Sequence, residues 1–162
     1  MSQSGEVQFR QAEPVDAEAV LEIKQTAIET AGEPYSDEQI AAWRPTEEAL
    51  SVFTQAMKSE QFVVLLVETD DGPAGYGVLN IDEARIDAVF VAPGHAGQGL
   101  GSSLVRQLET RAQMLGLADL TVVSSLNARG FYESLGYEPC GDRTRTIEGT
   151  DLGFVAVCKH LD

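Results

Sequence analysis

The chain has 162 residues and carries 26 acidic against 11 basic side chains, which gives a formal net charge of −15. A surface this acidic repels nucleic acid and anionic membranes, so neither is an expected partner. The length suits one domain over residues 1–162, in which residues 1–6 are expected to form a flexible N-terminal segment.

The acid-rich composition includes only three lysines, which are Lys24, Lys58 and Lys159. It fits either an ordinary acidic protein or a protein from a salt-accumulating organism, because high salt screens the repulsion between surface carboxylates. We favour the halophilic interpretation. The sequence has no apolar run long enough to cross a bilayer and no apolar leader at its start, so we expect a cytoplasmic protein.

The first predicted elements are a strand over residues 8–12 and a helix that opens at Pro14. A short helix follows over residues 37–43. Ser36 is its expected N-cap, and Gln39 stands at the position that completes a capping box.

The later elements alternate between β-branched apolar runs and helical apolar spacing. Thr46 is expected to cap a third helix that ends at Met57. The remaining predicted elements are strands over residues 62–67, 74–80 and 85–91, a helix from Leu100, a strand over 120–124, a helix over 128–135, and a final strand pair over 136–147 and 152–159. This order predicts an α+β fold with a central sheet flanked by helices.

A glycine-rich turn links the strand over 85–91 to the helix that starts at Leu100. Gly97, Gly99 and Gly101 alternate in this turn. Because they carry no Cβ, backbone N–H groups can converge on a ligand, and the helix N-terminus adds to the same anion site, which suits a pyrophosphate. The pattern G-x-G-x-G differs from the G-x-G-x-x-G of dinucleotide-binding folds, and no Lys-Ser or Lys-Thr follows, which excludes a nucleotide triphosphate loop.

A second motif begins where the strand over 120–124 ends. Residues 125–137 read S-L-N-A-R-G-F-Y-E-S-L-G-Y. With the V-x-P strand end and the glycine-rich turn, this block resembles the GNAT superfamily of acyl-CoA-dependent N-acyltransferases. The resemblance extends from Val7 to the C-terminus, and it implies a GNAT-like, mostly antiparallel sheet of about seven strands that is splayed at a coenzyme A site.

The resemblance further implies that acetyl-CoA is the co-substrate and that the glycine-rich turn holds it. Two positions depart from the family pattern: Ala96 stands where Arg or Gln is usual, and Ser125 stands where Asn is frequent. Backbone amides would then carry the phosphate contacts, with Gln98 as the nearest polar side chain. The implied coenzyme-binding residues are Phe90, Val91, Ala96, Gly97, Gln98, Gly99, Leu100, Gly101, Ser102 and Ser125.

Acetyl transfer to an amine requires a base for the ammonium, a donor for the oxyanion and an acid for the leaving thiolate. By the resemblance, Tyr132 is the expected acid, and the alternative is a packing aromatic beside Phe131, which is expected to be the better core residue. A backbone N–H near Phe90 or Val91 is the expected oxyanion donor.

Asp87 is the candidate base. It is the one ionisable side chain over residues 86–91, and alternation along the strand places it on the face of Val89 and Val91. The matched position in relatives often bears an acidic residue. The alternatives are a solvated residue at the start of the strand, or an ordered water that acts as the base instead.

The acceptor site that the resemblance implies lies near the first two helices, where Tyr35, Gln39 and Trp43 are the candidate substrate-binding residues. The alternative is that Tyr35 and Trp43 simply seal the helix pair to the sheet. We expect direct acetyl transfer in a ternary complex to a primary amine of a small molecule or peptide. The alternative function is a noncatalytic acyl-CoA-binding regulatory or protein-docking domain. The oligomeric state stays open, and a homodimer is one candidate.

Cysteine and histidine indicate no further chemistry. Cys140 and Cys158 form no metal-spaced cluster with His95 or His160, and we expect both to be buried free thiols. No metal site is expected.

Overall fold

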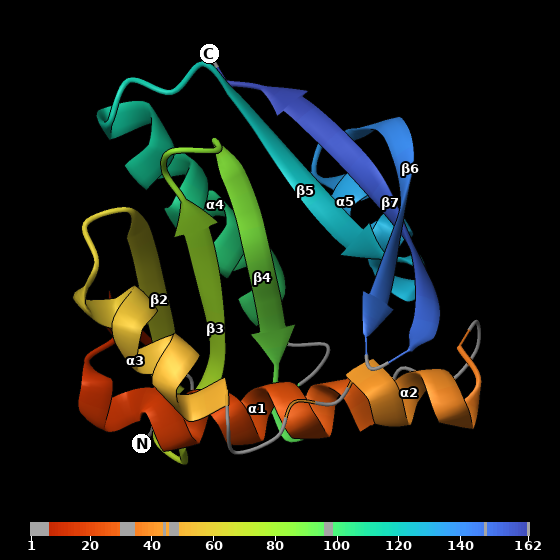
Figure 1. Ribbon diagram of the computed structural model, residues 1–162. Coiled ribbons are helices and arrows are strands. Elements are labelled where there is room, and N and C mark those ends of the chain that lie inside the picture. Colours follow the sequence, from red (N-terminus) through yellow and green to blue (C-terminus); the bar gives the residue numbers. More distant parts are fainter. Residues whose placement is uncertain are drawn as a thin grey trace.

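The computed structural model describes residues 7–29, 35–43, 45, 49–95, 99–147 and 149–161. Over these residues the chain forms a seven-stranded sheet with helices packed against it (Figure 1). The strands are β1 (Gln8–Gln11), β2 (Phe62–Thr69), β3 (Gly72–Asn80), β4 (Arg85–Val91), β5 (Asp119–Ser125), β6 (Glu138–Ile147) and β7 (Thr150–His160). The helices are α1 (Ala17–Glu29), α2 (Asp37–Trp43), α3 (Ala49–Lys58), α4 (Leu100–Met114) and α5 (Arg129–Ser134), with 3₁₀ turns η1 (Pro14–Asp16), η2 (Pro93–His95) and η3 (Leu126–Ala128).

The strands lie in the order β1-β2-β3-β4-β5-β7-β6 across the sheet. Every neighbouring pair is antiparallel except β4 and β5, which are parallel because α4 carries the chain from one to the other. This mostly antiparallel sheet with flanking helices confirms the fold class and the strand number that the sequence and its GNAT resemblance led us to expect. None of the helices in the described segments combines the length and apolarity needed to span a bilayer.

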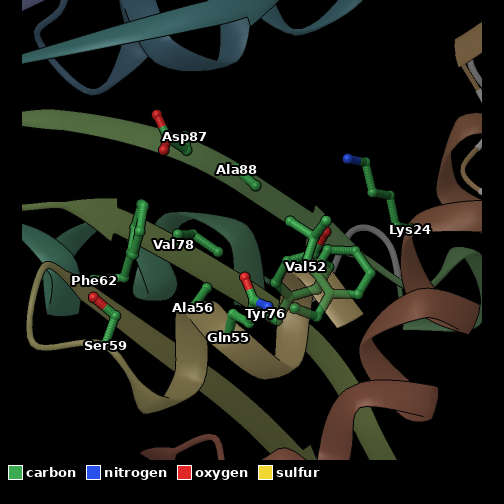
Figure 2. Close-up of a pocket in the computed structure, with 11 residues that line it drawn as sticks. Lys24, Val52, Gln55, Ala56, Ser59, Phe62, Tyr76, Val78, Asp87 and Ala88 are labelled. Carbon is green, nitrogen blue, oxygen red and sulfur yellow. The ribbon is translucent and has the colours of Figure 1, made fainter. Parts of the chain in front are cut away.

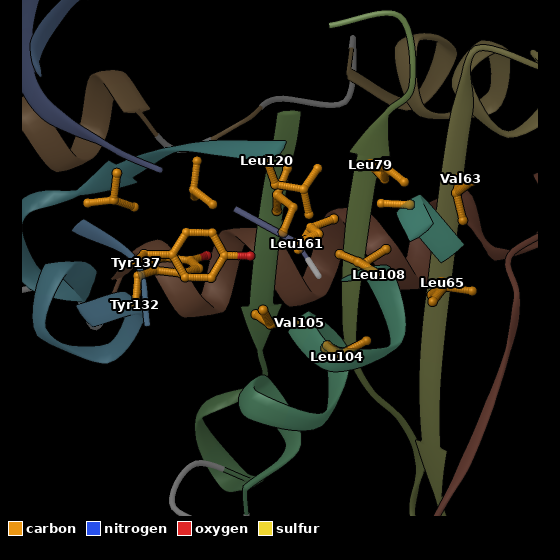
Figure 3. Close-up of a cluster of buried hydrophobic side chains, with 14 of the residues drawn as sticks. Val63, Leu65, Leu79, Leu104, Val105, Leu108, Leu120, Tyr132, Tyr137 and Leu161 are labelled. Atoms are coloured by element: carbon orange, nitrogen blue, oxygen red, sulfur yellow. The ribbon is translucent and has the colours of Figure 1, made fainter. Parts of the chain in front are cut away.

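Helices cover both faces of the part of the sheet formed by β2, β3 and β4. On one face, Leu104 and Leu108 of α4 belong to the largest buried cluster together with Leu79 of β3 (Figure 3). On the other face, Ile23 of α1 and Tyr76 of β3 share a second cluster, against which α3 packs. Two covered faces explain why β2 is a continuous apolar run rather than an alternating one.

The structure confirms most predicted elements with small shifts of their ends. The first strand ends at Gln11, one residue earlier than expected, and the helix predicted over 128–135 is shorter because its first turn is η3. The capping box of α2 is confirmed: the Gln39 N–H donates to Ser36 Oγ at 3.1 Å, and the Ser36 N–H donates to Gln39 Oε1 at 2.9 Å. Thr46 lies outside the described residues.

The expectation of two buried free thiols is wrong. Cys140 and Cys158 form a disulfide between β6 and β7, with their Cα atoms 6.1 Å apart. Cys140 is exposed, and Cys158 is half-buried. A bulge between Pro139 and Gly141 places Cys140 beside its partner in the antiparallel hairpin. Chain spacing gave no signal of this, because hairpin register decides whether two cysteines meet.

Candidate active site

The candidate site begins where β4 and β5 separate. Two residue pairs join these strands, Arg85 with Thr121 and Ile86 with Val122. Beyond them the strands diverge toward α1 (Figure 1), and a narrow slot of about 60 Å³ lies at the divergence. The slot is lined by Lys24, Trp43, Ala88, Val89, Phe90, Val122, Val123, Ser124, Ser125, Ala128, Tyr132 and Phe154.

Along β4, the backbone N–H groups point alternately toward β3 and toward the open edge that faces β5. The Ala92 N–H donates to the Ala74 carbonyl on the β3 side at 2.8 Å. Because backbone groups alternate in direction along an antiparallel ladder, the Phe90 N–H also points toward β3, whereas the Val89 and Val91 N–H groups point toward the open edge. Of the two positions expected to supply an oxyanion donor, the Val91 N–H therefore points toward the open edge and the Phe90 N–H does not.

A bulge in β4 decides where the carboxylate of Asp87 lies. Ile86 and Ala88 pair with consecutive residues of β3, so Asp87 between them has no partner of its own. Asp87 and Ala88 line the same pocket, whereas Val89 and Val91 pack on the opposite face of the sheet, against the cluster that contains α4. The prediction that Asp87 shares the face of Val89 is wrong, because the extra residue interrupts the alternation of the strand.

Two neighbours orient the Asp87 carboxylate. Arg85 Nε forms an ion pair with Asp87 Oδ1, and Asn80 Nδ2 lies 3.5 Å from Asp87 Oδ2. Asn80 is itself buried, and its amide oxygen accepts hydrogen bonds from Gln61 Nε2 at 3.3 Å and from the Glu83 N–H at 3.2 Å. With 26% of its side chain exposed, Asp87 remains within reach of a ligand while its orientation is held.

Tyr132 lines the slot from α5. Its ring packs against Phe131 and Tyr137, with centroid distances of 4.9 and 5.9 Å. Burial raises the pKa of the Tyr132 phenol above its ordinary value, so the hydroxyl stays protonated at neutral pH and can donate. The expectation that Phe131 is the better core residue is wrong: Tyr132 is 4% exposed, whereas Phe131 is half-buried.

The glycine-rich turn is described from Gly99 onward. Gly99 has a φ of 79°, a left-handed conformation that L side chains rarely adopt, and it leads directly into α4. Gly101 has a packing role, because a Cβ there would lie 3.2 Å from the ring of Phe131. Ser102 is half-buried at the start of α4. The expected phosphate-binding positions outside the described residues are Ala96, Gly97 and Gln98.

A larger pocket of about 430 Å³ lies on the face of β3 and β4 that α1 and α3 cover. It is lined by Lys24, Val52, Phe53, Gln55, Ala56, Ser59, Phe62, Tyr76, Val78, Asp87 and Ala88. Figure 2 shows Asp87 and Lys24 toward opposite ends of this pocket, with Ala88 between them. Because Lys24 and Ala88 also line the slot, the two cavities adjoin at β4.

None of the three expected acceptor-binding residues lines the larger pocket. Tyr35 is buried, and its hydroxyl donates to the Gly153 carbonyl and accepts from the backbone of η3, both at 2.8 Å. Gln39 completes the helix cap and donates to the Asp151 carbonyl at 3.0 Å. Trp43 lines the slot, with its ring 6.3 Å from that of Phe90. Tyr35 and Gln39 thus tie α2 to β7, while Trp43 borders a cavity.

Comparison with known proteins identifies the family. Residues 32–151 match the family model described as an acetyltransferase (GNAT) domain. The chain belongs to the GNAT family. An uncharacterized N-acetyltransferase named YafP, from Escherichia coli strain K12, is 29% identical over 133 residues, which cover 82% of this chain and 81% of YafP.

Solved GNAT structures share the fold. A crystal structure named GCN5-related N-acetyltransferase (aminotransferase, class II), from Rhodopseudomonas palustris, matches with a TM-score of 0.87 and 28% identity over 99% of both chains. The PaiA N-acetyltransferase of Thermoplasma acidophilum, solved in complex with coenzyme A, matches with a TM-score of 0.77 and 18% identity over 96% of this chain and 99% of that one. The strands β4 and β5 therefore diverge within a GNAT fold.

Lys24 and Tyr76 line the candidate site and Arg85 forms an ion pair with Asp87, and the sequence did not single these three out as site residues. Lys24 is the one cation of α1, in a chain with few lysines, and this was a usable signal. Arg85 stands two positions before Asp87 on a predicted strand, a spacing that places both on one face. Tyr76 gave no signal, because a tyrosine within an apolar strand has the pattern of a core residue.

Proposed function

We propose that the protein is an N-acetyltransferase that transfers the acetyl group of acetyl-CoA directly to a primary amine while both substrates are bound. The observation that carries the proposal is the junction of the two cavities at Ala88. Tyr132 borders the slot, and Asp87 borders the larger pocket. A candidate acid and a candidate base thus lie on the two adjoining cavities that a donor and an acceptor would occupy.

Acetyl-CoA is the proposed donor because the chain belongs to an acetyltransferase family and a protein of similar fold holds coenzyme A. The narrow slot suits a thioester and its extended arm. The N-terminus of α4, which Gly99 leads into, supplies backbone donors for a pyrophosphate. The proposed coenzyme-binding residues are Phe90, Val91, Ala96, Gly97, Gln98, Gly99, Leu100, Gly101, Ser102 and Ser125.

In the proposed reaction, the acceptor binds as an ammonium and gives one proton to the Asp87 carboxylate, directly or through a water molecule. The amine nitrogen then forms a bond to the thioester carbonyl carbon, and the Val91 N–H donates to the oxyanion. Collapse of the intermediate breaks the carbon–sulfur bond, and Tyr132 protonates the departing thiolate. The proton that the nitrogen sheds restores the phenol through solvent, which leaves an acetamide and the thiol of coenzyme A.

The three acceptor-site candidates receive different parts in this proposal. Trp43 forms a wall of the slot near the reacting groups, because its ring lies against Phe90 and Phe154. Tyr35 and Gln39 act indirectly: their side chains are engaged with backbone groups and hold α2 in place. The larger pocket beside Asp87 takes the body of the acceptor.

The test of the function is a calorimetric titration of acetyl-CoA in molar potassium chloride, followed by a free-thiol release screen across primary amines. Binding together with amine-dependent thiol release supports the acetyltransferase. Binding without release from any amine supports the noncatalytic acyl-CoA-binding domain instead. A folded protein that does not bind acetyl-CoA contradicts both.

The role of Asp87 has its own test in the exchange Asp87→Asn, which keeps the shape and removes the base. We expect kcat to fall about 100-fold or more, because general base catalysis typically contributes that much. Asp82→Asn is the matched control, since Asp82 is exposed in the turn before β4. Equal rates for the Asp87 variant and the wild type would assign the base to water.

A further inference from the structure

The larger pocket has an uneven distribution of charge. Among the described residues, its lining holds two charged side chains, Lys24 and Asp87, and most of the other lining residues are apolar. Asp87 lies at one end and Lys24 toward the other (Figure 2). Apolar walls with a few convergent polar groups are typical of small-molecule sites, and about 430 Å³ suits a compact ligand.

Two hydrogen-bond donors occupy the end of the pocket away from Asp87. Lys24 Nζ lies 5.9 Å from the ring centroid of Phe53 and 5.8 Å from that of Phe90. The ring of Tyr76 lies 6.3 and 5.8 Å from the same two rings. Lys24 and Tyr76 therefore share the same two aromatic neighbours in the lining of this pocket.

The hydroxyl of Tyr76 is buried and has no hydrogen-bond partner among the described residues. A buried hydroxyl without a partner destabilises the protein, and a ligand that accepts its hydrogen bond would remove this cost. An ammonium can only donate, and a phenol readily donates. The chemistry of this end therefore fits an acceptor of hydrogen bonds that also carries negative charge.

The two ends of the pocket are separated by the length of a short strand segment. Asp87 and Phe90 are three positions apart in β4, which corresponds to roughly 10 Å along the strand. An ammonium at Asp87 and an anion near Phe90 would thus belong to opposite ends of one molecule. An α-amino acid, whose two charged groups are adjacent, does not span this distance.

We propose that the acceptor is an amphiphile with a primary amine at one end, a carboxylate at the other and an apolar body between them. Lys24 and Tyr76 recognise the carboxylate, and Asp87 receives the amine. Short apolar peptides and apolar amino acids with a distal amine share this chemistry. The assignment rests on the proposed function, because that proposal places the reacting amine at Asp87.

Because the protein is strongly acidic, the proposed preference for an acceptor with a carboxylate depends on Lys24. A net charge of −15 repels anions from the surface, so an acceptor that carries a carboxylate needs a local cation to bind. Lys24 supplies that cation on a partly apolar wall, where screening by water is reduced. The proposal therefore predicts a preference opposite to that expected from net charge alone.

The test compares two amines of similar shape, para-(aminomethyl)benzoate and para-methylbenzylamine, which differ in the carboxylate. Binding is measured by calorimetry, and acetyl transfer by thiol release, for the wild type, Lys24→Met, Tyr76→Phe and Lys58→Met. Lys24→Met keeps the apolar stem and removes the charge. Lys58, exposed at the end of α3, is the control position.

We expect the wild type to bind the carboxylate-bearing amine about 10- to 100-fold more tightly than its neutral counterpart. Lys24→Met abolishes this preference, Tyr76→Phe reduces it without loss of folding stability, and Lys58→Met leaves it intact. A wild type that binds neither amine, or binds both equally, overturns the inference. A Lys24→Met variant that weakens acetyl-CoA binding but keeps the preference also overturns it, since Lys24 then serves the slot.

The same measurements separate this inference from the proposed function. Acetyl transfer to both amines without a carboxylate preference upholds the acetyltransferase and overturns the recognition by Lys24. Binding of para-(aminomethyl)benzoate that depends on Lys24, without any acetyl transfer, upholds the recognition site and contradicts the catalytic proposal.

Discussion

The sheet has two halves that differ in how their strands are held. In the half formed by β1 to β4, helices cover both faces of β2, β3 and β4, and residues such as Leu66 and Leu79 are fully buried. In β5 to β7, shorter helices α2 and α5 pack on the sheet, and the Cys140–Cys158 disulfide links the two strands of the last hairpin. Two residue pairs between β4 and β5 join the halves through the backbone.

The candidate site depends on the incomplete pairing of β4 with β5. A fully paired β4–β5 edge would engage its N–H groups in a ladder, whereas the separated edge leaves the Val89 and Val91 N–H groups available to a ligand. Each half also contributes one candidate catalytic side chain, Asp87 from the first and Tyr132 from the second. The relative placement of the halves must then come from side-chain packing, above all around α4.

The largest expected effect comes from removing the chemical contribution of the second half. In Tyr132→Phe we expect kcat to fall about 10²- to 10⁴-fold, because the thiolate loses its general acid. The packing of the ring against Phe131 and Tyr137 stays, so stability and acetyl-CoA affinity should not change. Steady-state kinetics and calorimetry on the same preparation measure both. An unchanged kcat would remove Tyr132 from the mechanism.

The elements of both halves could be predicted, because their signals are local. The apolar run over 62–67 and the Ser36 capping box depend on residues close together in the chain. Strand, glycine turn and helix around Gly99 likewise form one continuous motif. Tyr132 and Asp87 were named for their chemistry, and the structure places each on the lining of a cavity.

The details that could not be predicted depend on how distant segments fit together. The bulge at Asp87 arises from the register between β3 and β4, and the sequence of β4 alone does not predict it. The hairpin register that joins Cys140 to Cys158 is equally non-local. Lys24 and Tyr76 lie far apart in the chain and come to share Phe90 as a neighbour only when α1 packs on the sheet. Pairing, not composition, decides these features.

A core substitution tests whether packing at α4 couples the halves. Leu108 is fully buried in a cluster that contains Ile86 from the first half and Leu120 from the second. Leu108→Ala should lower the free energy of unfolding by about 2–5 kcal/mol through lost burial and a residual cavity. Chemical denaturation followed by far-UV circular dichroism and by Trp43 fluorescence measures it.

The control for this substitution is Met114→Ala, at the end of the same helix, where the side chain is 77% exposed. Its stability should stay close to that of the wild type. If the two probes already gave separate unfolding transitions in the wild type, the halves would unfold independently, and the view that α4 couples them would be wrong.

The disulfide acts within the second half alone. It closes a loop with a sequence separation of 18 residues, so the double variant Cys140→Ser, Cys158→Ser should lose up to about 3 kcal/mol of stability. Neither cysteine lines the slot or the larger pocket, and kcat should therefore stay unchanged. A reductant should bring the wild type to the stability of the variant. If the reductant did not change the unfolding free energy of the wild type, the disulfide between Cys140 and Cys158 would be contradicted.

The smallest expected effect concerns an ion cluster that belongs to the first half. Arg10 of β1 bridges Asp16 and Glu68, each at 2.9 Å. The hydrogen bonds from Arg10 hold the pKa of Asp16 below its ordinary value, and Asp16 also accepts from the Glu13 N–H at 2.8 Å. A carboxyl with a lowered folded-state pKa stabilises the protein above its unfolded pKa of about 3.9, and this contribution is lost as pH falls through the folded value.

Asp16→Asn should therefore cost about 1–2 kcal/mol of unfolding free energy at pH near 7, the range of a charge-assisted hydrogen bond on a largely buried carboxylate. The difference between wild type and variant should shrink as the pH is lowered from about 4, where Asp16 of the unfolded chain takes up a proton, through the lower folded-state pKa, where Asp16 of the folded wild type does. Glu22→Gln, at an exposed position of α1, is the control and should show no such convergence. Because β1 pairs with β2 alone among the strands of the sheet, far from β4, the variant should keep its acetyl transfer rate at neutral pH. A parallel loss of kcat would mean that the first half transmits strain to the site, and that β4 is less firmly held than its two covered faces imply.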